Sequence, residues 1–141
     1  MKDTLKPGIT FEFEYKISED KTVPHLFPEI TEGEVMPKVL ATGFLVGLFE
    51  FACIKAVNPH IEWPDEQTVG TGIKMDHTAA TPPGFIVTVK GRLEKVKGRK
   101  LSFLLEAHDG VDKISEATHE RFVINGKKFN EAVAEKAKSS K

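Results

Sequence analysis

The chain has 141 residues, a length typical of one domain, and we expect residues 1–141 to fold as one. Its 20 Lys and Arg residues nearly cancel its 21 Asp and Glu residues, which argues against a nucleic-acid partner held through phosphate contacts. A lone cysteine, Cys53, excludes an internal disulfide framework and a cysteine-rich zinc site. The first fifteen residues contain no continuous apolar stretch of the signal-peptide kind, so a reducing, cytoplasmic setting is expected.

The first predicted element is a strand over residues 9–17. Apolar and polar residues alternate there, with Ile9, Phe11 and Phe13 on one face and Thr10 and Glu12 on the other. This period of two is typical of a strand with one buried face.

The next element is a helix over residues 37–57, PKVLATGFLVGLFEFACIKAV. It is apolar on every side, which predicts burial on nearly all sides. It is too short for a membrane span and is interrupted by Glu50, so no membrane partner is expected. Gly43 and Gly47 lie four residues apart on one face, where they permit close approach of a strand or of a second copy of the helix.

Most of the remaining chain predicts strands, followed by a short helix over 129–138. Turn sequences at Lys97-Gly98-Arg99 and Asp109-Gly110 separate strands in hairpins. The predicted strands cover residues 68–80, 85–93, 101–107 and 114–124.

One strand, one apolar helix and four further strands predict an α+β hot-dog fold, in which an antiparallel sheet of five or six strands wraps around a central helix. A helix-grip fold is the competitor, but there the gripped helix usually comes last. A single sheet covers only one side of the helix. We therefore expect the glycine-bearing side to face a partner in a homodimer.

Glu50 is the most informative residue for function, because it is the only residue between Lys38 and Lys55 that is charged at neutral pH. A buried carboxylate needs a donor, water or a ligand. It is either a general base or nucleophile in a pocket, or a structural acid. Thr42 precedes it by eight residues, about 12 Å along a helix axis, so the two side chains cannot touch. Taken alone, Thr42 is better explained as a helix-end residue.

The histidines and glycines give weaker signals. No two of the five histidines form an H-x-x-x-H pair, so no metal site is predicted. His77 lies in a segment expected to line the helix and is suited to proton transfer. His119 has the same strand parity as Arg121 and is open to either interpretation. Gly70 and Gly72 indicate a bulge, or a backbone N–H available to an oxyanion.

Four segments carry a resemblance to a known family. They are KTVPHLFPE, PKVLATGFLVGLFEFACIKA, HTAATPPG and AHDGVDKISEATHER, and they begin at residues 21, 37, 77 and 107. Together they resemble the fluoroacetyl-CoA thioesterases, a hot-dog family, and the likeness spans most of the chain.

The resemblance implies hydrolysis of a short acyl-CoA to a free acid and CoA, with CoA as part of the substrate and no separate cofactor. It implies that Thr42, Glu50 and His77 act together on the thioester. By the same resemblance Gly70 helps to hold the thioester carbonyl, and Arg121 lies near the pocket.

One position departs from the family pattern. By the resemblance, the fluoroacetyl-specific enzyme has an aromatic pocket lid where this chain has Met36. The resemblance therefore implies the thioesterase chemistry but not the fluoroacetyl preference. Two rival functions remain. A hot-dog dehydratase would need an Asp and a His near the helix start, and they are missing. A non-catalytic protein that binds acyl-CoA or an apolar ligand is the alternative.

Overall fold

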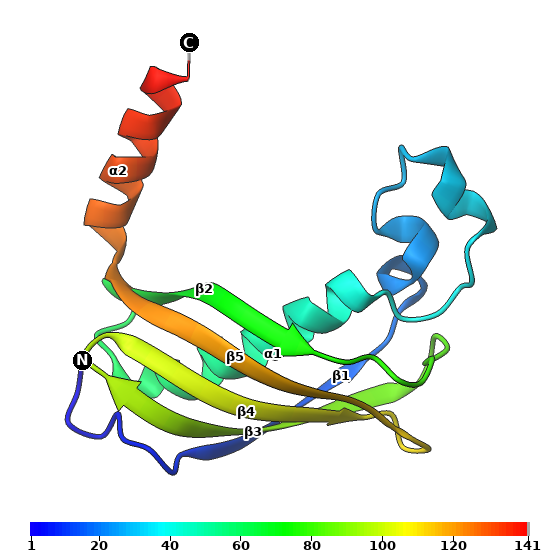
Figure 1. Ribbon diagram of the computed structural model, residues 1–141, viewed down its shortest axis with the longest axis horizontal. Coiled ribbons are helices and arrows are strands. Elements are labelled where there is room, and N and C mark those ends of the chain that lie inside the picture. The colour runs from blue at the N-terminus through cyan, green and yellow to red at the C-terminus, as the bar shows by residue number, and fades with distance from the viewer. Residues whose placement is uncertain (141) are drawn as a thin grey trace.

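The computed structural model describes residues 1–140, and its sheet has five antiparallel strands in the order β1-β3-β4-β5-β2. Figure 1 shows the sheet curving beneath the helix α1, which lies on its concave face. The strands are β1 (Thr10–Lys16), β2 (Glu66–Met75), β3 (Ile86–Lys97), β4 (Lys100–His108) and β5 (Lys113–Asn125). The predicted hot-dog architecture is confirmed.

Alternating side chains explain why the sheet has one buried face. In β5, every second residue from Ser115 to Val123 is buried, and the residues between them are exposed or partly exposed. The hairpin between β3 and β4 turns at Gly98, whose φ of 60° is a conformation that glycine adopts without strain. The expected strand at 68–80 is shorter than predicted, because residues beyond Met75 leave the ladder.

Helix α1 (Thr42–Val57) begins five residues later than the sequence predicted. The reason is that the preceding residues make long-range backbone bonds. The amide of Leu40 donates to the carbonyl of Thr81 at 2.8 Å, and that of Ala41 donates to the carbonyl of Lys21 at 3.1 Å. Pro37 therefore lies in the irregular segment before the helix and not in the first helical turn.

The burial of α1 is one-sided in the single chain. Six residues are buried against the sheet: Leu45, Leu48, Phe49, Ala52, Cys53 and Val57. Phe51, on another side, is 60% exposed. The expectation of burial on nearly all sides is thus wrong for one copy of the chain, because a single sheet covers only the face turned toward it.

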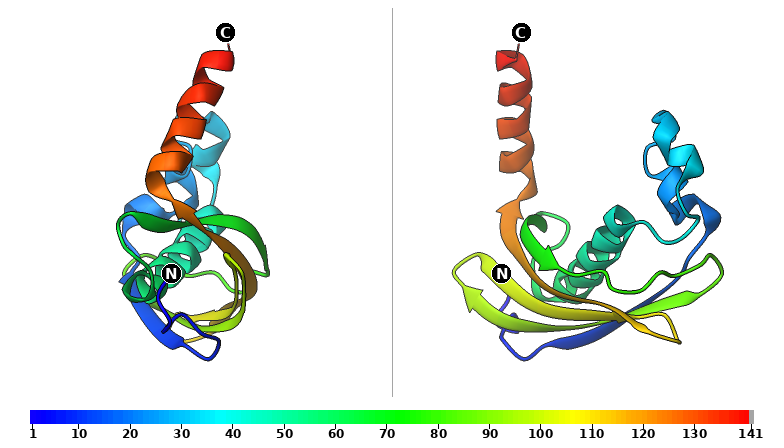
Figure 2. Two further views of the ribbon diagram at one scale, coloured as in Figure 1. Left: turned by 90° about the vertical axis from the view of Figure 1, so that its left-hand side faces the viewer. Right: turned by 45° about the vertical axis from the view of Figure 1, so that its right-hand side comes forward.

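Two elements extend from the sheet on the side that carries α1, as the views in Figure 2 show. The helix α2 (Gly126–Ser139) follows β5 directly, capped by the Asn125 side chain, which accepts from the Lys128 amide at 3.0 Å. The other element, here called the cap segment (residues 18–38), contains the three short 3-10 helices η1 (Glu19–Lys21), η2 (Val23–His25) and η3 (Thr31–Val35). A further 3-10 turn, η4 (Asn58–His60), ends α1.

Candidate active site

The functional candidates fall into two groups, one at the start of α1 and one at its middle. In the first group the Thr42 hydroxyl lies 2.8 Å from Nδ1 of His77. Ala41, not Thr42, is the N-cap residue of α1, so the helix-end explanation does not account for the Thr42 hydroxyl. The hydroxyl instead fixes the imidazole ring.

The position of His77 follows from the end of β2. The Asp76 carboxylate accepts from the Glu116 amide at 2.8 Å, and the Thr78 amide donates to the Ile114 carbonyl at 2.8 Å. These bonds on both sides of His77 fix its backbone against β5. Its Nε2 is buried without a hydrogen-bond partner, and an unpartnered buried nitrogen is costly. Burial lowers the pKa of His77, and the neighbouring Asp76 charge opposes that shift.

In the second group, the Glu50 carboxylate is held by Arg121. Arg121 Nη1 donates to Glu50 Oε2 at 2.9 Å. The guanidinium is 2% exposed, whereas the Glu50 side chain is 38% exposed, so the predicted deep burial of Glu50 is wrong in the single chain. An acid that is anchored at one oxygen and open to incoming molecules is suited to act as a base or nucleophile.

Arg121 itself is anchored by Thr68 on β2. Its Nε donates to the Thr68 hydroxyl and its Nη2 to the Thr68 carbonyl, both at 2.9 Å. This forked arrangement uses the rigid geometry of the guanidinium. Thr68 was not singled out from the sequence, because a threonine in a strand carries no signal of its own.

Gly70 brings bare backbone next to the Glu50 carboxylate. A Cβ atom at Gly70 would lie 2.7 Å from Glu50 Oε2 and 3.3 Å from Arg121 Nη1. The pairing of β2 with β5 shifts by one residue between Gly70 and Gly72, which confirms the predicted bulge. β2 is an edge strand, so one side of it has no neighbouring strand.

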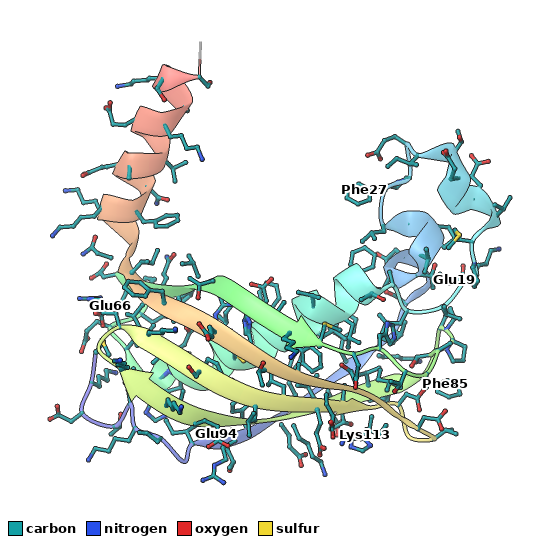
Figure 3. The ribbon with its side chains drawn as sticks, in the orientation of Figure 1. Glu19, Phe27, Glu66, Phe85, Glu94 and Lys113 are labelled. Carbon is teal, nitrogen blue, oxygen red and sulfur yellow. The ribbon has the colours of Figure 1, made fainter. Side chains whose placement is uncertain are left out.

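The cap segment contacts the first group. A Cβ atom at Gly43 would lie 3.1 Å from Leu26 Cδ1, so the cap segment packs against the residue that follows Thr42. Phe27, which is 56% exposed, points from this segment toward the open side of the molecule (Figure 3). Met36 follows η3 and is 47% exposed.

Two features are absent from the residues that the structure describes. Among residues 1–140, no group of three His, Cys, Asp or Glu side chains is placed to hold a metal ion. Within the same residues, no helix has both the length and the apolar character that crossing a membrane requires.

Comparison with known proteins identifies the family. The model of the fluoroacetyl-CoA-specific thioesterase family matches residues 18–127. The fluoroacetyl-CoA thioesterase of Streptantibioticus cattleyicolor is 50% identical over 136 residues, which are 96% of this chain and 97% of that protein.

Solved structures support the same family. A phenylalanine-to-alanine mutant of the fluoroacetyl-CoA-specific thioesterase FlK, in complex with fluoroacetate and CoA, superposes with a TM-score of 0.86 at 50% identity, covering 89% of this chain and 99% of that one. A hot-dog-like protein from Thermanaerovibrio acidaminovorans is 17% identical with a TM-score of 0.76 over 92% of this chain and 91% of that one, which supports the fold alone. The chain therefore belongs to the fluoroacetyl-CoA-specific thioesterase family.

Proposed function

We propose that this protein is a thioesterase that hydrolyses short acyl-CoA thioesters to the free acid and CoA. Family membership supports the reaction class. The single observation that carries the proposal for the site is the Glu50 carboxylate, bonded to Arg121 at 2.9 Å beside the bare backbone of Gly70. A protein that only bound acyl-CoA would have no need for a half-exposed carboxylate held in this way.

In the proposed reaction Glu50 either attacks the thioester carbonyl carbon or removes a proton from the water that does so. The carbonyl oxygen becomes an oxyanion, which the backbone N–H near Gly70 stabilises. When the C–S bond breaks, the CoA sulfur leaves and takes up a proton through His77, which Thr42 orients. In the water route this is the proton that Glu50 removed from water. In the nucleophilic route water gives that proton to His77 as it splits the Glu50–acyl anhydride into the free acid and the Glu50 carboxylate. CoA is part of the substrate, and no other cofactor or metal takes part.

The two groups of residues are too far apart in one chain to act on one carbonyl. Thr42 and Glu50 stand eight positions apart on α1, about 12 Å along its axis. We therefore propose a homodimer in which Thr42 and His77 of one copy face Glu50, Gly70 and Arg121 of the other. The exposed Phe51 and the one-sided burial of α1 support a second copy on that face.

The rest of the proposal concerns the setting of the enzyme. We propose that the chain forms one domain. We also propose that it works in the cytoplasm, a reducing compartment in which a buried free thiol such as that of Cys53 stays reduced. Burial raises the pKa of the Cys53 thiol to about 12, so this cysteine is not a rival nucleophile.

The experiment that tests the function measures thiol released from acetyl-, propionyl-, butyryl- and longer acyl-CoAs by the purified protein. We expect turnover that is greatest for the smallest acyl groups. A protein that binds these thioesters in calorimetry and releases no thiol from any of them would be the non-catalytic binding protein instead.

We expect weak discrimination between fluoroacetyl- and acetyl-CoA. We propose that Met36 borders the acyl pocket, as the family resemblance implies. Its flexible side chain would define a pocket wall poorly, and small differences in an apolar pocket change kcat/KM by roughly 10- to 200-fold. The Met36→Phe variant should raise the ratio of kcat/KM for fluoroacetyl-CoA to kcat/KM for acetyl-CoA by about tenfold or more.

The matched control is Val35→Phe, which adds an aromatic ring at a neighbouring side chain that is 88% exposed, and should leave the ratio unchanged. A parent enzyme that already prefers fluoroacetyl-CoA by many thousandfold would show that Met36 does not weaken selection.

A further inference from the structure

His119 is a buried histidine with both ring nitrogens engaged, and the proposed reaction assigns it no part. It is 2% exposed and lies on the inner face of β5, two residues before Arg121. Its Nδ1 lies 2.7 Å from the Gly72 carbonyl oxygen, and its Nε2 lies 3.1 Å from Arg121 Nη1.

These two contacts fix the protonation state of the ring. The carbonyl oxygen of Gly72 only accepts, so Nδ1 must carry the hydrogen of that bond. The Arg121 guanidinium only donates, so Nε2 must present its lone pair. Both conditions hold only for a neutral imidazole protonated at Nδ1. Burial lowers the pKa of His119, which favours this neutral form.

The ring connects two features of the proposed active site. Through Nδ1 it holds the bulge of β2 at Gly72, two residues after the backbone N–H near Gly70. Through Nε2 it holds Nη1 of Arg121, the same nitrogen that donates to Glu50. A Cβ atom at Gly70 would also lie 3.4 Å from His119 Cε1, so the ring lies against the bulge itself.

We propose that His119 is a positioning residue of the thioesterase site, which as a neutral hydrogen-bond acceptor sets the place of Arg121 Nη1 and, through it, of the Glu50 carboxylate. The inference rests on the proposed function. It also makes activity depend on the protonation of a group that does not touch the substrate.

The charges that surround the ring give the direction of this dependence. Arg121 and Glu120 lie on its own strand and Glu50 on α1. β2 contributes an uncharged carbonyl, and β4 contributes Phe103, whose ring centroid is 6.3 Å away. A proton on Nε2 would face the Nη1 hydrogens at 3.1 Å and place a second cation beside Arg121. Activity should therefore fall as pH falls through the pKa of His119 in the folded protein.

Three variants separate the roles of the two nitrogens. His119→Gln places an amide oxygen near the Nε2 position and cannot titrate, so kcat at pH 7.5 should stay within about tenfold of the parent and persist to lower pH. His119→Asn keeps a donor for Gly72 and lacks the acceptor for Arg121. His119→Phe keeps ring volume without either contact. The last two should lose about 100-fold in kcat with little change in KM, the size of effect that a 1 Å misplacement produces.

The control is His108→Gln, which removes a half-exposed histidine at the end of β4 and should leave kcat and the pH profile unchanged. Folding of each variant is checked by circular dichroism. A folded Asn or Phe variant with parental kcat would overturn the proposal. So would a Gln variant whose kcat falls with decreasing pH as the parent's kcat does.

Nitrogen-15 NMR of the parent's histidine rings needs no variant and no substrate. We expect the His119 ring to be neutral at pH 7, with the hydrogen on Nδ1. An imidazolium, or a hydrogen on Nε2, would overturn the proposal even if every variant failed to fold. A parent that released no thiol would overturn the proposed function, whereas the NMR result would still report whether His119 holds Arg121 as described.

Discussion

Glu50→Gln is expected to abolish most thioester hydrolysis while leaving the fold intact. The amide has the volume of the carboxylate, and its oxygen still accepts from Arg121 Nη1, which lies 2.9 Å from the acid oxygen in the parent. It cannot act as a base or a nucleophile at neutral pH. We expect kcat on the best acyl-CoA to fall by about 10³-fold, within the range found for general acid–base catalysis.

The matched control for this variant is Glu94→Gln. Glu94 is also a glutamate beside an arginine, with its carboxylate 3.7 Å from Arg92 Nε and its side chain 32% exposed, but it lies on β3 away from the site (Figure 3). This control should retain parental kcat. If Glu50→Gln retained near-parental kcat as well, Glu50 would be a structural acid and the proposed mechanism would be wrong.

Gly70→Ala should have the second-largest effect, because the added methyl group has no room. Its carbon would lie 2.7 Å from Glu50 Oε2, closer than Cβ atoms are found to other atoms. The carboxylate must therefore move away from the backbone of β2. A shift of about 1 Å in a reacting group costs on the order of 100-fold in rate, and we expect kcat/KM to fall by at least that factor.

Gly126→Ala is the control for the added methyl group. A Cβ atom there meets the Asp65 carbonyl and the Gln67 side chain at 3.5 Å, which is ordinary van der Waals contact. We expect parental kinetics and parental thermal stability from this variant. Parental kinetics in Gly70→Ala itself would mean that the Glu50 carboxylate does not need its present position for hydrolysis.

Much of the fold was predictable because each element carries its own periodic pattern. The alternation over residues 9–17 predicted β1, and the glycine turns at 98 and 110 predicted the β3–β4 and β4–β5 hairpins. The start of α1 was not predictable in this way. Residues 37–41 continue the apolar pattern of the helix apart from Lys38, and their backbone bonds to Lys21, Val23 and Thr81, distant in sequence, keep them out of the helix.

The site was predictable where a residue conflicts with its surroundings. Glu50 is conspicuous as a charge within an apolar helix, and Arg121 and His119 share the inner parity of β5. The bonds among these residues were not predictable, because they depend on the one-residue bulge in β2 that turns the Gly72 carbonyl toward His119. Thr68 gave no signal, since only its hydrogen bonds to Arg121 on the neighbouring strand give it a role.

We infer that one active site is built from two copies of the chain. Complementation between two inactive variants, Thr42→Ala and Glu50→Gln, tests it most directly. In a twofold dimer, a mixed pair would hold one site with both Thr42 and Glu50 intact and one site with neither.

The two variants would be co-expressed with different affinity tags, and the mixed dimer would be purified through both tags. Thiol release from acetyl-CoA would then be compared with that of each variant alone and of the parent. We expect the mixed dimer to regain about half of the parental kcat per dimer, because one of its two sites is complete. A mixed dimer as inactive as each variant alone would show that Thr42 and Glu50 of the same chain serve the same site, and would contradict an active site shared between two copies.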